Sequence, residues 1–189
     1  MERIEYQITF VSFFIGLGVA DLFTSLVRMI KEKHKVQWHW LPLFWIVIAF
    51  MGLIIGWFAF FAMFQNELTR YAWGFIFAIA PAIFIFAFTV SVVPHKIPME
   101  GLNLKEYYFQ HQKLIFTFLS LDYLFRILTW YFIINPMYAN SDILSQLIVF
   151  LTIEVLVVGL IFIKNLKYHA FVATVVFLFL LLQLVFQQV

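Results

Sequence analysis

Hydrophobic residues fall into six long runs along the chain, and short polar segments separate the runs. Two of these runs, residues 41–64 and 71–93, contain no charged residue. A helix crosses the roughly 30 Å hydrocarbon core of a bilayer with about 20 apolar residues, and its backbone polar groups are then bonded internally. The pattern therefore predicts six transmembrane helices, at residues 8–30, 41–64, 71–93, 114–134, 143–163 and 170–186.

The segments that connect the six runs are too short to fold as separate domains. The longest of them spans residues 94–113. We therefore expect residues 1–189 to form one domain of the all-α class, a polytopic integral membrane bundle with short loops.

Lysine and arginine are distributed unequally between the two sides of this predicted bundle. The N-terminus, the even-numbered connecting segments and the C-terminus share one side, which holds Arg3 and Arg70. The odd-numbered segments and their borders hold Arg28, Lys31, Lys33, Lys35, Lys96, Lys105, Lys113, Lys164 and Lys167. By the positive-inside rule the odd-numbered segments are cytoplasmic, which predicts a multi-pass protein of a cell membrane with both termini outside.

The composition agrees with a protein whose solvent is lipid. The chain is 65% hydrophobic and 12% charged, whereas a soluble domain is about 45 to 50% apolar and about 25% charged. The net charge of +2 is too small and too dilute to predict a nucleic-acid partner. Because cysteine is absent, disulfides and thiolate chemistry are excluded. We also expect no cofactor.

Small residues recur at helical spacing in the first three runs. Inside lipid, helices approach one another closely where small side chains face each other. The sequence therefore predicts packing faces at Gly16, Ala20, Gly52, Gly56, Gly74 and Ala78. Pro81, near the middle of the third run, predicts a bend in that helix.

Four ionisable residues fall well inside predicted spans: Asp21, Asp122, Arg126 and Glu154. A charge at the centre of a transmembrane helix costs about 2.5 to 3.5 kcal/mol on insertion scales, so such residues need partners. Asp122 and Arg126 are four residues apart with the acid first, a spacing that predicts an ion pair.

The first run adds a polar stripe, because Asp21, Thr24, Ser25 and Arg28 fall on one helical face. One interpretation is a proton or cation pathway formed by Asp21, Ser25, Arg28, Asp122, Arg126 and Glu154. The other is a buried network of the same residues that fixes the register and assembly of the helices.

All five histidines fall in the predicted cytoplasmic connecting segments. Neutral imidazole binds iron and zinc, so His34, His39 and His111 are weak candidate metal ligands. Their spacing contains one H-x4-H and no denser cluster, which falls short of a di-iron site. Contact with lipid headgroups is the alternative interpretation.

Two stretches of the sequence resemble a known family. The segment FIGLGVADL at residues 14–22 precedes a basic connecting segment and a tryptophan-containing run, and LKEYYFQHQK at residues 104–113 precedes Phe116. This pattern resembles a family of small uncharacterised bacterial six-span integral membrane proteins with an LGLG-like first helix and a tryptophan-rich second helix. Tyr107 stands where that family often has histidine. The resemblance implies six spans in a bacterial inner membrane, and it supplies no activity that could be carried over to this chain.

The sequence leaves three functions open. The first is a small ion- or proton-conducting bundle that uses the polar network at mid-depth. The second is a non-enzymatic membrane subunit or sensor, whose basic cytoplasmic segments bind a soluble partner or anionic lipid. The third is a histidine-based membrane metalloenzyme. Membrane lipids are the expected partners in each, and further copies of the chain in a homo-oligomer are an open alternative.

Overall fold

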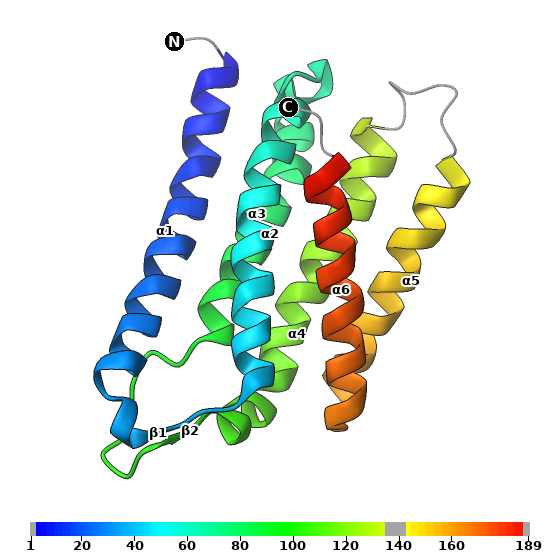
Figure 1. Ribbon diagram of the computed structural model, residues 1–189. Helices are drawn as coiled ribbons and strands as arrows, with labels where there is room; N and C mark the ends of the chain where they lie inside the picture. Colours follow the sequence, from blue (N-terminus) through cyan, green and yellow to red (C-terminus); the bar gives the residue numbers. More distant parts are fainter. Residues whose placement is uncertain (1–2, 135–142, 187–189) are drawn as a thin grey trace.

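The computed structural model describes residues 3–134 and 143–186, and these residues form a bundle of six α-helices (Figure 1). The helices are α1 (Arg3–Lys31), α2 (Trp40–Phe64), α3 (Ala72–Val92), α4 (Leu104–Thr129), α5 (Ile143–Phe162) and α6 (Leu166–Phe186). The expected all-α bundle is therefore present.

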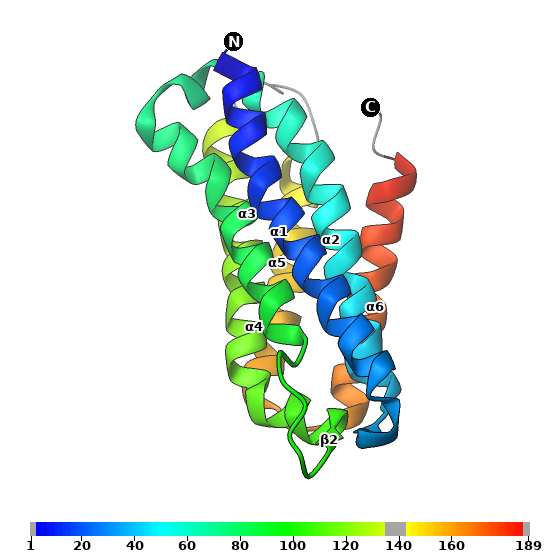
Figure 2. The ribbon, with the colours of Figure 1, turned by 90° about the vertical axis from the view of Figure 1, so that its left-hand side faces the viewer.

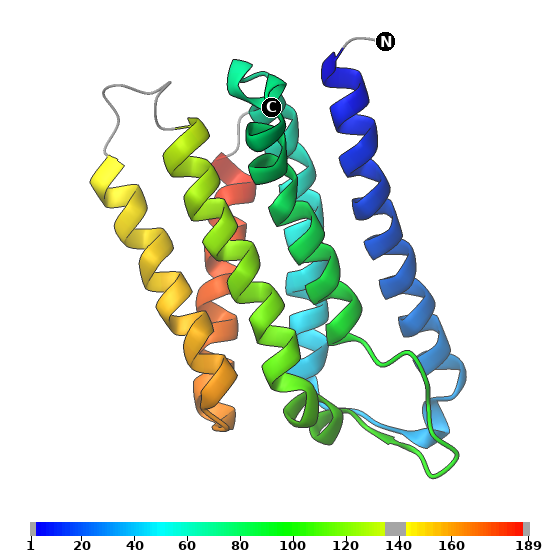
Figure 3. The same ribbon diagram turned by 180° about the vertical axis from the view of Figure 1, so that it is seen from behind.

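The six helices lie in two layers. In one layer α2 packs between α1 and α6, and in the other α4 packs between α3 and α5 (Figures 1 and 3). The layers meet where α3 packs against both α1 and α2, as the view turned by 90° shows (Figure 2). Helix α1 begins and α6 ends at the same end of the bundle, which we call the terminal end.

The opposite end carries two very short strands, and we call it the β end. Strand β1 (Val36–Gln37) pairs in parallel with β2 (Leu102–Asn103), and a turn of 3-10 helix, η1 (Lys33–Lys35), precedes β1. Gly101 has a φ of +102°, and a Cβ there would lie 3.0 Å from the carbonyl oxygen of Lys35. Glycine alone fits this left-handed conformation without strain. The pairing joins the first and third connecting segments, which the sequence did not predict.

The helices agree closely with the predicted spans at α2, α3 and α5, whereas α1, α4 and α6 begin several residues before the predicted spans. Helix α4 begins at Leu104 instead of residue 114, because the Asn103 side chain caps it by accepting hydrogen bonds from the amides of Lys105 and Glu106. The Asn165 side chain likewise accepts a hydrogen bond from the amide of Lys167, so α6 begins at Leu166 instead of residue 170. A search for apolar runs stops at the membrane border, whereas a capped helix continues into the polar segment.

At the terminal end, a second 3-10 turn, η2 (Glu67–Arg70), links α2 to α3. Gln7 of α1 donates a hydrogen bond to the carbonyl oxygen of Thr69 at 2.8 Å. Asn66 donates one at 2.6 Å to the carbonyl oxygen of Ile133, in the π-helical turn η3 (Trp130–Ile134) that follows α4. These bonds connect α1 and α4 to the same turn.

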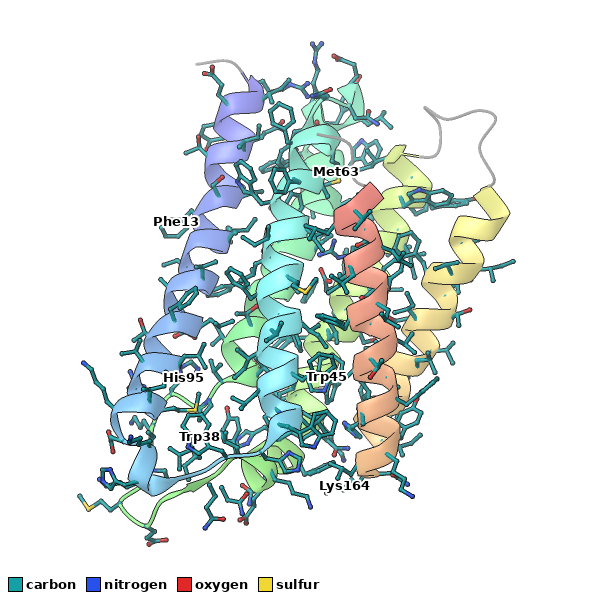
Figure 4. The ribbon with its side chains drawn as sticks, in the orientation of Figure 1. Phe13, Trp38, Trp45, Met63, His95 and Lys164 are labelled. Carbon is teal, nitrogen blue, oxygen red and sulfur yellow. The ribbon has the colours of Figure 1, made fainter. Side chains whose placement is uncertain are left out.

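Within the described residues, five helices are long and apolar enough to cross a membrane: α1, α2, α3, α4 and α6. Helix α5 contributes a shorter apolar stretch, Leu147–Phe162. Large apolar side chains such as Phe13 and Val185 are exposed by 63% and 72% on the outside of the bundle (Figure 4). These helices are compatible with an integral membrane protein, whose outer surface faces lipid.

The predicted packing faces are present in α2 and α3 and absent in α1. A Cβ on Gly52 would lie 3.0 Å from Ile85, and a Cβ on Gly74 would collide with the carbonyl oxygen of Leu68. Ala78 is completely buried. In contrast, Gly16 has no neighbour within 4 Å of a built Cβ and Ala20 is exposed, so this face of α1 packs against none of the residues that the structure describes. Gly18, on the other side of α1, lies against Leu53 and Phe86 instead.

We expect Gly74→Ala to destabilise the protein by about 1 to 3 kcal/mol, because the new methyl group forces the backbone of η2 to move. Gly16→Ala is the matched control, and it should raise stability by about 0.5 to 1 kcal/mol because alanine restricts the unfolded chain more than glycine does. Thermal unfolding of both variants in detergent measures the difference. Equal midpoints for the two variants would contradict this packing.

Candidate functional site

The structure divides the four ionisable residues of the predicted spans between two places. Asp122 and Arg126 lie in α4, with Glu154 on the facing helix α5, whereas Asp21 lies near the connecting segment between α3 and α4. The expectation of one common network is therefore wrong for Asp21, and the candidate site consists of the α4 and α5 residues.

Asp122 and Arg126 form the ion pair that their spacing predicts. Arg126 Nε donates to Asp122 Oδ2 at 2.8 Å. Asp122 is only 2% exposed, and its second carboxylate oxygen, Oδ1, is buried without a hydrogen-bond partner. A buried pair with an unsatisfied oxygen carries a large desolvation penalty, which makes this pair a candidate for a functional role.

Gly56 of α2 provides the space for the guanidinium group. A Cβ at Gly56 would lie 3.6 Å from Arg126 Nη2, an ordinary van der Waals distance, so the guanidinium group lies directly beside this glycine. Within the part of the chain that the structure describes, the Arg126 side chain makes no hydrogen bond besides the one to Asp122. Its two Nη groups are thus available to a ligand or to water.

A cavity of about 160 Å³ lies beside this ion pair, between α2, α3, α4, α5 and α6. Along α2 it extends from Ile48 to Met63, close to the terminal end. Its other walls include Pro81 and Ile85 of α3, Thr129 of α4, Trp130 of η3, Phe150 of α5, and Val176, Leu180 and Gln183 of α6. The walls are largely apolar, and the Asp122–Arg126 pair supplies the charge.

Packed aromatic rings separate this cavity from the β end. Trp45 of α2, whose position Figure 4 marks, is completely buried. Its ring centroid lies 5.0 Å from that of Phe116 and 6.2 Å from that of Phe88. The cavity therefore reaches toward the terminal end and is closed toward the β end.

Glu154 occupies the interface between α4 and α5. Ser120 Oγ donates to Glu154 Oε1 at 2.6 Å, and the other carboxylate oxygen, Oε2, is buried without a partner. Glu154 does not line the cavity, but Ser120 lies only two residues before Asp122 on α4. The two acids thus flank the same segment of α4, and each has one unpartnered oxygen.

Asp21 belongs to a separate cluster nearer the β end. Its Oδ1 lies 3.6 Å from His95 Nδ1, and the guanidinium of Arg28 donates to the carbonyl oxygen of His95. Figure 4 marks His95 beside the lower part of α1. Ser25, on the same stripe, is buried, whereas Thr24 is exposed. The stripe therefore attaches α1 to the α3–α4 connection and does not reach the cavity.

His169 was expected in a connecting segment, and this expectation is wrong. It lies in α6 and is completely buried. Its Nε2 lies 2.7 Å from the carbonyl oxygen of Ile163, which can only accept, so Nε2 carries the hydrogen. Its Nδ1 therefore accepts the hydrogen bond from the Tyr108 hydroxyl at 2.6 Å.

These bonds attach α4 to the α5–α6 turn. Gln112, one turn after Tyr108, donates to the carbonyl oxygens of Leu160 and Ile161. The spacing of Tyr108 and Gln112 on α4 was the available signal in the sequence, but it does not reveal the partner helix.

The three weak metal-ligand candidates lie apart from the cavity. His34 and His111 are exposed, and His111 stacks on Tyr107 with ring centroids 4.3 Å apart. His39 Nδ1 accepts a hydrogen bond from the amide of Leu41, and partial burial together with the positive charge of Lys105 lowers the pKa of His39. Over residues 3–134 and 143–186, no three His, Asp or Glu side chains are grouped so that they could hold a metal ion.

Comparison of the chain with protein-family models, with curated proteins and with solved structures finds no match. The resemblance to small bacterial membrane proteins consequently stays a prediction. The functional interpretation depends on the geometry of the cavity and its ion pair.

A double-mutant cycle measures how strongly Asp122 and Arg126 depend on each other. We expect Asp122→Asn to destabilise the protein by about 3 to 5 kcal/mol, because it leaves the guanidinium buried without a counter-ion. Arg126→Met should cost less, because Asp122 can take up a proton whereas arginine cannot lose one. The double variant should be more stable than the sum of the single effects predicts.

The exposed pair Glu67–Arg70 is the control for this cycle. Its atoms approach to 2.6 Å, but both side chains are more than half exposed, so its coupling should be about 0 to 1 kcal/mol. Additive effects at Asp122 and Arg126, measured by chemical unfolding in detergent, would show that the pair is not coupled.

Proposed function

We propose that the chain is a six-span integral membrane protein with both termini outside, and that it moves protons through the cavity beside Asp122 and Arg126. The observation that carries this proposal is a buried carboxylate with an unpartnered oxygen on the wall of a cavity that extends toward the terminal end of the bundle. Intramembrane acids that face an internal cavity mark proton and ion pathways in membrane proteins.

The geometry favours protons over metal cations. A cation such as Na⁺ or K⁺ needs several oxygen ligands in place of its water shell, and the walls of this cavity are largely apolar. The fixed positive charge of Arg126 would also repel a cation that enters. A proton needs only one acceptor at a time, and Asp122 Oδ1 and Glu154 Oε2 are both without partners.

A complete pathway requires a second conformation in which the packed rings of Trp45, Phe88 and Phe116 move apart. Trp45 and Phe116 close the cavity toward the β end in the structure described here. Pro81 lies in the cavity wall inside α3 and removes a backbone hydrogen bond from that helix. We place the hinge of this movement at Pro81, since proline is a common site of helix bending.

Proton flux into proteoliposomes tests the proposal. A potassium gradient with valinomycin drives protons, and a trapped pH-sensitive dye reports the flux. Asp122→Asn and Glu154→Gln should each reduce the rate toward that of protein-free vesicles, because an amide cannot carry the proton. Glu67→Gln changes an exposed carboxylate in the same way and should leave the rate unchanged. Wild-type rates in both Asp122→Asn and Glu154→Gln would remove these residues from the mechanism.

A second candidate function is favoured by the exposed lysines of the β end. Lys33, Lys96, Lys105 and Lys164 lie in or beside connecting segments at this end and are all exposed. Near an anionic membrane surface each basic residue contributes about 1 kcal/mol of attraction. This surface fits a regulatory role in which anionic lipid headgroups, or a soluble partner, bind the basic side of the bundle.

Native mass spectrometry of the purified protein tests the lipid version of this role. We expect bound phosphatidylglycerol on the wild-type chain and less of it after Lys96→Gln and Lys105→Gln together. Arg3→Gln and Arg70→Gln remove the same number of charges at the terminal end and serve as the control. Equal lipid retention in both double variants would contradict a specific role for the β end.

A further inference from the structure

We propose that the cavity binds a small carboxylic acid with a compact apolar tail, about the size of benzoate, and that one proton enters with each carboxylate. This inference rests on the proposed function in one respect, namely that Asp122 exchanges protons. It adds a substrate class to the same site and makes the bundle a proton-coupled carrier of weak organic acids.

The head of such a ligand is recognised by Arg126. Its Nε is engaged by Asp122 at 2.8 Å, while its Nη groups make no hydrogen bond to a described residue. Gly56 leaves the space beside Nη2 without a side chain. The planar guanidinium group matches the two oxygens of a carboxylate, and this match is stronger and more directional than contact with a lysine.

The tail is selected by the apolar walls and the volume. Ile48, Phe60 and Met63 of α2 face Val176 and Leu180 of α6 across the cavity. An apolar protein cavity of about 150 Å³ accommodates benzene, and the volume here is about 160 Å³. A hydrated inorganic anion would gain no binding free energy from contact with these walls, whereas a phenyl ring or a short branched alkyl chain would fill the cavity.

The charges at the site require that a proton accompany the ligand. The Asp122–Arg126 pair is already neutral, and Asp122 is 2% exposed, so the pair lies in surroundings of low polarity. A second carboxylate would leave one net negative charge there, and burying an uncompensated charge is strongly unfavourable. A proton on Asp122 Oδ1, the oxygen without a partner, restores neutrality and lets Arg126 pair with the ligand.

Isothermal titration of the full-length protein in lipid nanodiscs with sodium benzoate tests this inference. We expect saturable binding with uptake of about one proton per benzoate, measured by repeating the titration in buffers of different ionisation enthalpy. Arg126→Gln should weaken binding by about tenfold or more, as expected for the loss of a charged hydrogen-bond donor. Asp122→Asn should abolish the proton uptake.

Two substitutions of alanine by phenylalanine test whether the ligand lies in the cavity. Ala59→Phe fills the cavity from α2 and should prevent binding, whereas Ala20→Phe adds the same ring to an exposed position of α1 and should not. A comparison without mutation uses benzyl alcohol, which has a similar shape and no charge. Benzyl alcohol that binds as tightly as benzoate, or benzoate that binds without proton uptake, would overturn the inference even if a variant fails to fold.

Failure of this inference can be distinguished from failure of the proposed function, because the two are measured separately. Proton flux in vesicles without benzoate tests conduction by the chain alone. Benzoate binding with proton uptake but without such basal flux supports the carrier and removes the uncoupled conduit. Basal flux without any benzoate binding does the reverse and overturns the carrier.

Discussion

The neutralisation of Arg126 by Asp122 is the interaction on which the inside of this bundle depends. A guanidinium group cannot lose its proton in a protein, so a helix that carries one at this depth needs an adjacent anion. The spacing within α4 supplies the anion locally, without help from another helix. Because the pair is satisfied along its own helix, the neighbouring helices need only make room for it, and Gly56 of α2 does so.

The cavity follows from the same arrangement. Helix α6 packs on α2 and α5, and the residues of α2, α4 and α6 around the ion pair do not close completely on one another. Toward the β end, the larger rings of Trp45, Phe88 and Phe116 fill the corresponding space. The charged pair therefore lies beside a cavity on the terminal side of these packed rings.

The sequence predicted those features that depend on neighbours along the chain. Hydrophobic runs located six helices, and the i, i+4 spacing predicted the pair of Asp122 and Arg126. Features that depend on distant parts of the chain were missed. Asp21 meets His95, and Tyr108 meets His169, across separations of 74 and 61 residues in sequence, which no periodicity reveals.

The exposed and buried faces of α1 illustrate the same limit. Gly16 and Ala20 have the spacing of a packing face, but α2 and α3 approach α1 at Gly18. Small residues show that another helix can approach closely, but they do not show which helix does so. Likewise, Gly56 looked like an ordinary packing residue, and its proximity to Arg126 became evident only from the crossing of α2 and α4.

The parallel pairing of β1 with β2 can form only at a late point in the synthesis of the chain. Its two partners, Val36 and Leu102, are separated by two complete helices, so the first hairpin of the bundle leaves the ribosome with an open loop. Strand β1 can pair only after residues 102 and 103 of β2 have been synthesised, which is after α2 and α3 are complete. Once formed, the pairing holds the segment that follows α1 beside the start of α4.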